Sequence, residues 1–197
     1  MTRLLDEALP HWDVNEVHDA FVPAPPERAY QAVRAVTVGE IRLLAPLMAL
    51  RLLPAVLLRR SLPAGRSGPV LDAMVKSGFA LLGEREPEEV AVGVAGRFWL
   101  PTAGDSIRSV AGLEEFVAFD EPGFAKAASD FRVVPEQDGS RVITETRVAA
   151  VDDDARLSFA RYWRLIGGGS GLIRVSWLNA VRRRATRVGA AGVREAA

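Results

Sequence analysis

The stretch that decides the fold is residues 141–187, RVITETRVAAVDDDARLSFARYWRLIGGGSGLIRVSWLNAVRRRATR. From Val142 to Ala150 the residues alternate and are rich in Val, Ile and Thr, which is typical of a half-buried strand. One face of this strand carries Val142, Thr144, Thr146 and Val148, and the other carries Ile143, Glu145 and Arg147. Because charged side chains favour water, the Val/Thr face is predicted to look inward.

A long helical region is predicted after this strand. Asp152, Asp153 and Asp154 end the strand and place negative charge where a helix begins. Apolar residues then recur at helical spacing, first as Phe159, Tyr162, Trp163 and Ile166, and later as Leu172, Ile173, Trp177, Ala180 and Val181. The glycines at 167–169 predict a break between two helical segments, with Ser170 as the N-cap of the second.

The preceding residues predict further strands and helices. Strands are expected at 16–22, 79–86, 88–99, 115–119 and 125–134, and helices at 27–36 and 70–77. Gln137 to Ser140 form a hairpin turn into the strand at 142, because Asp-Gly supplies the required positive backbone angles. This order predicts an α+β arrangement, in which a strongly bent antiparallel sheet grips the C-terminal helical region and buries the apolar stripes of both.

One domain is predicted, at residues 15–187, between a flexible lead-in at 1–14 and a disordered tail at 188–197. The chain has 197 residues, of which 49% are hydrophobic, so it can bury a sizeable core. Its 25 basic and 25 acidic residues balance, which argues against a general nucleic-acid binder. It has no cysteine, which excludes disulfides and thiolate chemistry. Polar residues interrupt the N-terminus where a signal peptide would be apolar, so a cytoplasmic location is predicted.

Residues 40–62, EIRLLAPLMALRLLPAVLLRRSL, form the most apolar segment. Its length approaches that of a membrane span. Arg42 and Arg51 oppose spanning, since a central Arg costs about 2.5–3.5 kcal/mol on insertion scales. Pro46 and Pro54 interrupt the segment as well. It is therefore predicted to form short helices that act as a lid over a core or cavity, and an interfacial membrane contact remains an alternative.

The chain resembles the START/Bet v 1-like superfamily, also called SRPBCC, which includes polyketide cyclases and lipid-transfer proteins. The resemblance lies in VHDAFVPAPPERAYQAV at 17–33, GRFW at 96–99, FDEPGFAKAASDFRV at 119–133, ITETRV at 143–148 and RYWRLI…GSGLIR at 161–174. The last four segments resemble a bacterial subgroup that has no assigned activity. The resemblance implies a helix-grip fold with an internal cavity for an apolar ligand. The glycines at 167–169 depart from the uninterrupted terminal helix of that pattern, so either a bend or two helices are expected there.

Seven residues are candidates to line such a cavity: Val94, Phe98, Phe131, Thr144, Thr146, Tyr162 and Trp163. The two threonines would supply hydroxyl groups to an otherwise apolar wall, which is the usual makeup of a ligand pocket. The alternative is that the threonines reflect strand propensity and that the aromatic residues are plain core.

Residues suited to other chemistry are few. His18 lies in the first strand and is able to act near neutral pH if Asp19, Asp130 or Glu145 orients it, although a structural role is the simpler explanation. Glu145 and Arg147 are interpreted as a surface charge pattern. The two histidines have no ligand spacing, so no metal is expected. The GGGSG run lacks the lysine of a phosphate loop, and no cofactor is expected.

Three functions remain open from the sequence. The first is binding of a hydrophobic, lipid- or polyketide-like small molecule between the sheet and the C-terminal helix. The second is a polyketide aromatase/cyclase-like enzyme on the same fold, which requires His18, Asp130 and Tyr162 to converge on one pocket. The third is a membrane-surface or partner-binding protein that uses 40–62 and the basic C-terminus. The sequence assigns no catalytic residue and leaves the oligomeric state open.

Overall fold

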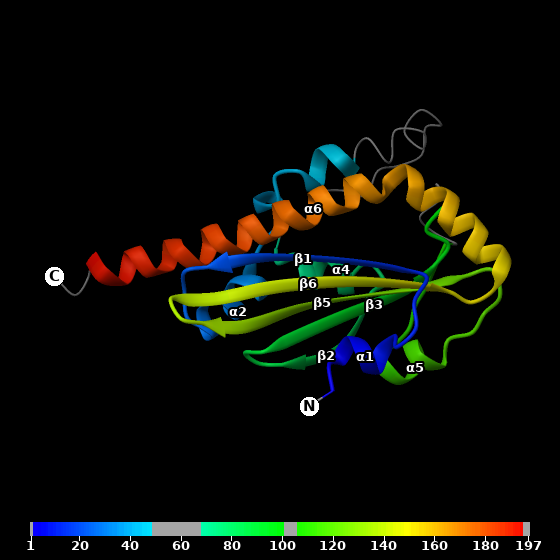
Figure 1. Cartoon of the computed structure of the whole chain (residues 1–197), viewed down its shortest axis with the longest axis horizontal. Helices are drawn as coiled ribbons and strands as arrows, with labels where there is room; N and C mark the ends of the chain where they lie inside the picture. Colours follow the sequence, from blue (N-terminus) through cyan, green and yellow to red (C-terminus); the bar gives the residue numbers. More distant parts are fainter. Residues whose placement is uncertain (1, 49–67, 101–105, 195–197) are drawn as a thin grey trace.

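The computed structural model describes residues 2–48, 68–100 and 106–194. It confirms the predicted α+β class: a curved, open antiparallel sheet packs against a long C-terminal helix (Figure 1). In chain order the described elements are α1 (Leu4–Ala8), β1 (Val14–Val22), α2 (Pro26–Ala35), η1 (Val38–Glu40), α4 (Val70–Val75), β2 (Ala80–Arg85), β3 (Glu89–Gly96), β4 (Ile107–Arg108), α5 (Leu113–Ala118), β5 (Ala125–Glu136), β6 (Gly139–Ala150) and α6 (Asp153–Arg194).

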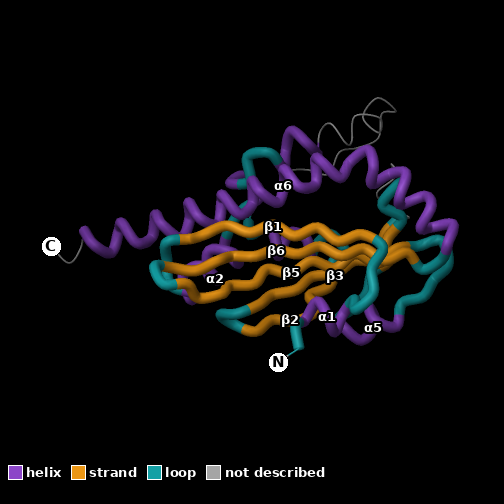
Figure 2. The backbone as a smooth tube through the Cα atoms, viewed as in Figure 1, coloured by secondary structure: helices purple, strands orange, loops and turns teal. Residues whose placement is uncertain are grey.

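The sheet has the strand order β1-β6-β5-β3-β2, and the short β4 pairs with β3 (Figure 2). All the pairs are antiparallel. The hairpin predicted around Asp138 is confirmed, because Glu136 at the end of β5 pairs with Gly139 at the start of β6. The first strand of the chain, β1, pairs with the last, β6. This pairing brings β1 and the residues that follow β6 together at one edge of the sheet.

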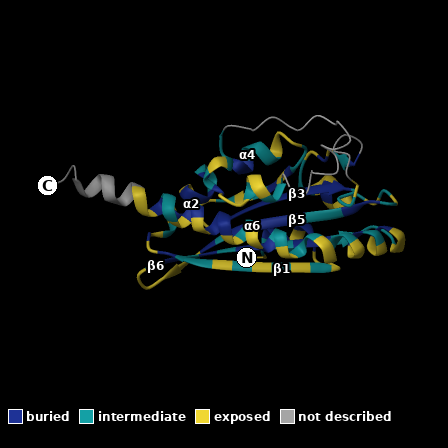
Figure 3. Cartoon of the chain, turned by 90° about the horizontal axis from the view of Figure 1, so that it is seen from above, coloured by how far each residue is buried: buried dark blue, intermediate teal, exposed yellow. Residues whose placement is uncertain are grey.

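One face of the sheet packs against α2 and α6, and we call it the helix face. Its core joins strand residues such as Val92, Phe131 and Val142 to Tyr30 of α2 and Trp177 of α6. The same alternation places Thr144 and Thr146 on this face, as the sequence predicts, because each lies two residues along β6 from its neighbour. Figure 3 shows buried and exposed residues interleaved along α6, as expected for a helix that packs one side on a sheet.

The opposite face, which we call the outer face, was expected to be wet, and it is exposed at Val17 and Asp19 of β1. Its part over β3 and β5 is instead covered by α1 and α5, which pack Leu5 and Phe116 against Ala91 and Ala128 (Figure 1). The prediction that residues 1–14 form a flexible lead-in is therefore wrong for residues 4–8. These residues form a helix in which Leu4, Leu5 and Ala8 are buried. Short helices gain stability mainly by packing an apolar face, and α1 does so here.

Three other local predictions are corrected. Residues 115–119 are not a strand, since Leu113 to Ala118 form α5, a case in which a short apolar run does not distinguish helix from strand. The C-terminal helix is not broken at its glycines, because α6 is continuous from Asp153 to Arg194, although Figure 1 shows that it changes direction along its course. The predicted tail at 188–197 is thus helical as far as Arg194.

The predicted lid at 40–62 falls only partly within the described residues. Its start is held against α6, where the amide of Leu43 donates to Ser176 Oγ at 3.2 Å. Arg184 pairs with Glu40 at 2.9 Å, and Arg183 donates to the Glu40 carbonyl. The remaining residues of the segment, 49–62, lie outside the described ranges.

Candidate functional site

A row of polar side chains crosses the helix face between one apolar row and one row of mixed polarity. Glu16 on β1 lies opposite Thr146 on β6, and Thr146 lies opposite Ser129 on β5. Directly opposed residues of an antiparallel pair share a face, so these side chains are neighbours. The apolar row on one side is Val14, Val148, Ala127 and Val94, and the row on the other side begins with His18 and Thr144 and continues through Phe131 and Val90.

The polar side chains of this region are linked in pairs. His18 Nε2 lies 3.0 Å from Glu16 Oε1. The hydroxyl groups of Ser129 and Thr146 lie 3.0 Å apart, and Ser129 Oγ also lies 3.1 Å from the Glu145 carbonyl. The Thr144 hydroxyl donates to the Asp130 carbonyl at 2.8 Å. Thr144 is therefore engaged by the backbone, whereas Glu16 retains a second carboxylate oxygen.

Helix α6 passes close to Glu16 and His18 at Gly171. A Cβ atom at residue 171 would lie 2.7 Å from Glu16 Oε1 and 3.4 Å from the His18 ring, so glycine leaves the room that these side chains occupy. Arg174 follows one helical turn later on the same side, beside Trp177, with its guanidinium carbon 5.6 Å from the Trp177 ring centroid. Burial lowers the pKa of Arg174 to about 10, against the opposing influence of the Glu16 carboxylate.

We call Glu16, His18, Ser129, Thr146 and Arg174 the polar band. Three buried polar atoms in or beside it have no hydrogen-bond partner among the described residues: Glu16 Oε2, Arg174 Nη1 and Trp177 Nε1. In native proteins more than nine in ten buried polar groups are paired, so three such atoms in one region need an explanation. One is an acceptor and two are donors, and they lie on an otherwise apolar face.

The seven residues predicted to line a cavity lie in three places. Phe98, Tyr162 and Trp163 gather around Phe159, with ring centroids 6.3, 6.1 and 5.7 Å from its ring. Phe131 packs on Trp177 at 4.7 Å, beyond the polar band. Val94 is buried on β3, and Thr144 and Thr146 lie on β6 between the two aromatic groups. The helix face thus holds all four strand residues that were predicted.

The glycines of α6 offer a direct test of this geometry. Gly168→Ala and Gly169→Ala are each expected to raise the free energy of unfolding by about 0.5–1 kcal/mol, because alanine is the better helix former and nothing lies within 4 Å of either new Cβ. Gly171→Ala has the same helical gain, but its Cβ displaces the Glu16 carboxylate from His18. Urea unfolding of the three variants should therefore show a smaller gain, or a loss, at 171. Equal gains at all three positions would contradict the contact between α6 and Glu16.

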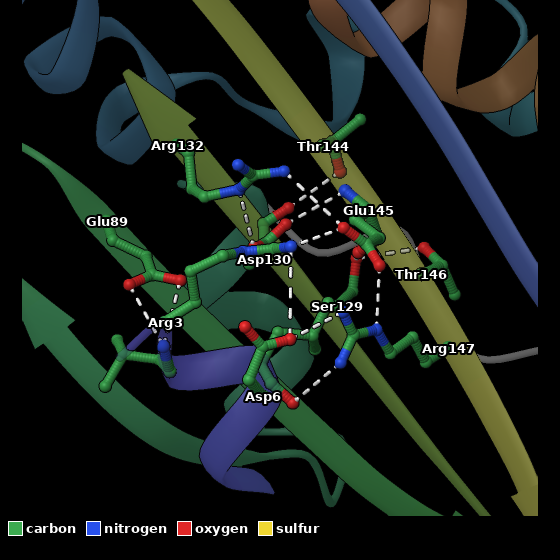
Figure 4. Close-up of polar contacts among 12 residues, drawn as sticks. Arg3, Asp6, Glu89, Ser129, Asp130, Arg132, Thr144, Glu145, Thr146 and Arg147 are labelled. Carbon is green, nitrogen blue, oxygen red and sulfur yellow. Dashed lines mark hydrogen bonds and ion pairs between the residues drawn. The ribbon is translucent and has the colours of Figure 1, made fainter. Parts of the chain in front are cut away.

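A second polar cluster lies on the outer face, beneath α1 (Figure 4). Arg3 of α1's N-cap donates to Asp130 at 3.3 Å and to Glu145. Glu145 also accepts from Arg147 at 2.7 Å, and Arg132 donates to Asp130 at 3.0 Å. Glu145 and Arg147, expected on a wet surface, are instead only 4% and 3% exposed. Their charges are tolerated because each is paired.

The two carboxylates of this cluster have opposite pKa shifts. Burial raises the pKa of Asp130, and the nearby Arg132 only partly offsets this effect. Burial acts in the same direction on Glu145, but the hydrogen bonds from Arg3 and Arg147 outweigh it and lower the pKa of Glu145. All the described arginines in the cluster have carboxylate partners, so the arrangement ties α1 to the sheet, and Arg3 Nε is buried without a hydrogen-bond partner among the described residues.

The residues weighed for an enzyme do not converge. His18 lies on the helix face and pairs with Glu16, whereas Asp130 lies on the outer face and pairs with Arg3. Tyr162 belongs to the aromatic group around Phe159. None of the predicted partners of His18, which were Asp19, Asp130 and Glu145, is the carboxylate it contacts. In the part of the chain that the structure describes, no group of three or more His, Asp or Glu residues is placed to hold a metal ion.

Sequence reasoning missed Glu16 and Arg174. A signal exists for each of them. Glu16 alternates with Val14 and His18, so it shares their face of the strand. Arg174 lies three residues before Trp177, within the stripe that packs on the sheet. A charged residue at an apolar position of a helical repeat is the feature that would have identified it.

No family model and no curated protein sequence matches this chain. Among solved structures it is similar to TTHA0849 from Thermus thermophilus, at 11% identity over 89% of this chain and 99% of that one, with a TM-score of 0.35. It is also similar to CalU16 from Micromonospora echinospora, at 11% identity over 89% of this chain and 86% of that one, with a TM-score of 0.29. Similarity at this level carries no argument about function.

Proposed function

We propose that this protein binds a hydrophobic, lipid- or polyketide-like small molecule between the helix face of the sheet and α6. The observation that carries the proposal is the set of three buried, unpartnered polar atoms, Glu16 Oε2, Arg174 Nη1 and Trp177 Nε1, on a face otherwise lined by aliphatic and aromatic side chains. Small-molecule sites have this makeup, with an apolar wall and a few polar groups that fix orientation. The ligand class agrees with the one that the START/Bet v 1-like resemblance implies.

Native mass spectrometry of the gently purified protein tests this proposal. We expect a stoichiometric adduct that solvent extraction releases as an apolar compound. Adding apolar compounds to any ligand-free fraction should raise its melting temperature, because a ligand that binds only the folded state stabilises it. A ligand-free mass combined with unchanged melting temperatures would count against the proposal.

A second candidate function is binding to an anionic membrane surface. The exposed side of α6, which faces away from the sheet, favours this function. Leu157, Leu165, Leu172 and Val175 are exposed there, and Leu165 is 84% exposed. No acidic residue occurs from 155 to 194, and Arg161 and Arg164 are exposed beside the leucines. Exposed apolar residues flanked by arginines are the pattern of an interfacial helix. No helix in the described ranges is long and apolar enough to cross a membrane.

Vesicle flotation distinguishes this second function from the first. Phosphatidylcholine vesicles that contain phosphatidylglycerol should float the protein, and vesicles without it should not, because the anionic lipid attracts the arginines. Leu165→Ser should weaken flotation without lowering stability, since Leu165 is exposed. Absence of flotation with both vesicle types would remove the membrane function and leave the ligand proposal untouched.

A further inference from the structure

We infer that the polar band selects an uncharged headgroup that both donates and accepts hydrogen bonds, such as a carboxamide, on the apolar ligand. This inference rests on the proposed function, because it specifies the ligand of the same site. It depends on the chemical nature of the unpartnered atoms and on the balance of charge around them.

The unpartnered atoms define what the headgroup must supply. Glu16 Oε2 is an acceptor and therefore needs a donor from the ligand. Arg174 Nη1 and Trp177 Nε1 are donors and need acceptor lone pairs. Arg174 and Trp177 are neighbours on α6, so one carbonyl oxygen with two lone pairs is suited to both. A carboxamide offers this combination, because its NH2 group donates and its carbonyl oxygen accepts with two lone pairs.

Charge excludes the simpler headgroups. The Glu16 carboxylate and the Arg174 guanidinium carry opposite charges and attract each other, and His18 is hydrogen-bonded to Glu16. A carboxylate ligand would pair with Arg174 but would bring a second anion beside Glu16 and offer it no donor. An ammonium ligand would pair with Glu16 but would face the buried cation of Arg174. In a region of low dielectric, such like-charge contacts are costly, so a neutral group is favoured.

A series of probes with one apolar body tests the inference. Calorimetric titration of the purified protein would compare 2-naphthamide with methyl 2-naphthoate, 2-naphthoate and naphthalene. The amide is expected to bind about 10- to 100-fold more tightly than the methyl ester, because the ester lacks the donor for Glu16, and hydrogen bonds to charged groups contribute effects of this size. The carboxylate is expected to bind more weakly than the amide by a similar factor.

Two substitutions assign the selectivity to named residues. Glu16→Gln should weaken amide binding and at the same time strengthen 2-naphthoate binding, since it removes the anion that opposes the carboxylate. A merely structural role of Glu16 would weaken both ligands together. Arg174→Met should reduce the binding of every probe that carries a carbonyl and leave naphthalene unchanged. Arg182→Met, an exposed arginine on the same helix, is the matched control and should change none of them.

The outcomes separate this inference from the proposed function. Equal affinity across the series would overturn the headgroup selectivity while supporting an apolar site. Tighter binding of the carboxylate than of the amide would overturn it in favour of an anion site at Arg174. Failure of all the probes to bind would overturn both the inference and the proposed function for ligands with an aromatic body.

Discussion

The Glu145→Gln variant is expected to unfold at a temperature about 6–20 °C below that of the parent protein. Glu145 is buried and accepts hydrogen bonds from Arg3 and Arg147. Without the charge of Glu145, Arg3 and Arg132 keep only Asp130 as a buried carboxylate partner. Burial already makes Asp130 harder to ionise. Breaking a buried ion pair by neutralising one member costs about 3–5 kcal/mol, and each kcal/mol lowers the melting temperature of a chain of this size by about 2–4 °C.

Glu136→Gln is the matched control for this prediction. Glu136 also pairs with an arginine at 2.6 Å, but the contact is exposed at the β5–β6 hairpin. Water screens such a pair, so its loss should change stability by no more than about 1 kcal/mol. If the two variants melted at the same temperature, the outer-face cluster would have no special role in holding α1 to the sheet.

The effect of Glu145→Gln should also depend on pH. The pKa of Glu145 is lowered in the folded state from its ordinary value of 4.5, so between these two pKa values the unfolded chain binds more protons than the folded one. The stabilisation from Glu145 is therefore complete above pH 4.5 and is lost as the pH falls through the lowered pKa. Unfolding curves of the parent and the variant should approach each other in acid.

Glu145 and Arg147 of β6 show how much of a strand's surroundings its alternation pattern can predict. Alternation correctly separates Thr144 and Thr146 from Glu145 and Arg147, because side chains on a strand point to opposite faces in turn. It does not reveal what covers each face. The outer face is buried around Glu145 because α1 brings Leu4 and Leu5 together with Arg3, which supplies the charge that Glu145 requires. Nothing within β6 itself predicts this contact between segments more than a hundred residues apart.

The candidate site was predictable to a similar extent. The aromatic residues and threonines of the helix face follow from periodicity, because they lie in elements whose period the sequence shows clearly. The polar band does not, since it depends on register: Glu16 becomes a neighbour of Thr146 only when β1 pairs with β6 in one specific alignment. The contact of Glu16 with Gly171 depends further on the path of a continuous α6, whereas the glycines at 167–169 predicted a break in this helix.

The Arg174→Met variant is expected to be more stable than the parent protein when no ligand is bound. Burial lowers the pKa of Arg174 to about 10, which means that the folded state disfavours its charge at neutral pH. Methionine keeps an unbranched apolar stem beside Trp177 and removes the buried cation. Arg174 forms no ion pair within 4.0 Å among the described residues, and its Nη1 is buried without a hydrogen-bond partner. Burying a polar group without a partner costs about 1–3 kcal/mol, so removing Arg174 should raise the melting temperature by roughly 2–12 °C.

The sign of this change decides between two roles for Arg174. If Arg174 serves the fold, its loss should lower the melting temperature, as the loss of Glu145 does. If it serves a ligand, the protein carries a destabilising charge for the sake of binding, and Arg174→Met should combine higher stability with weaker binding of carbonyl-bearing probes. Arg182→Met should change neither property, because Arg182 is exposed on the same helix. A destabilised Arg174→Met variant would instead place Arg174 among the residues that hold α6 to the sheet.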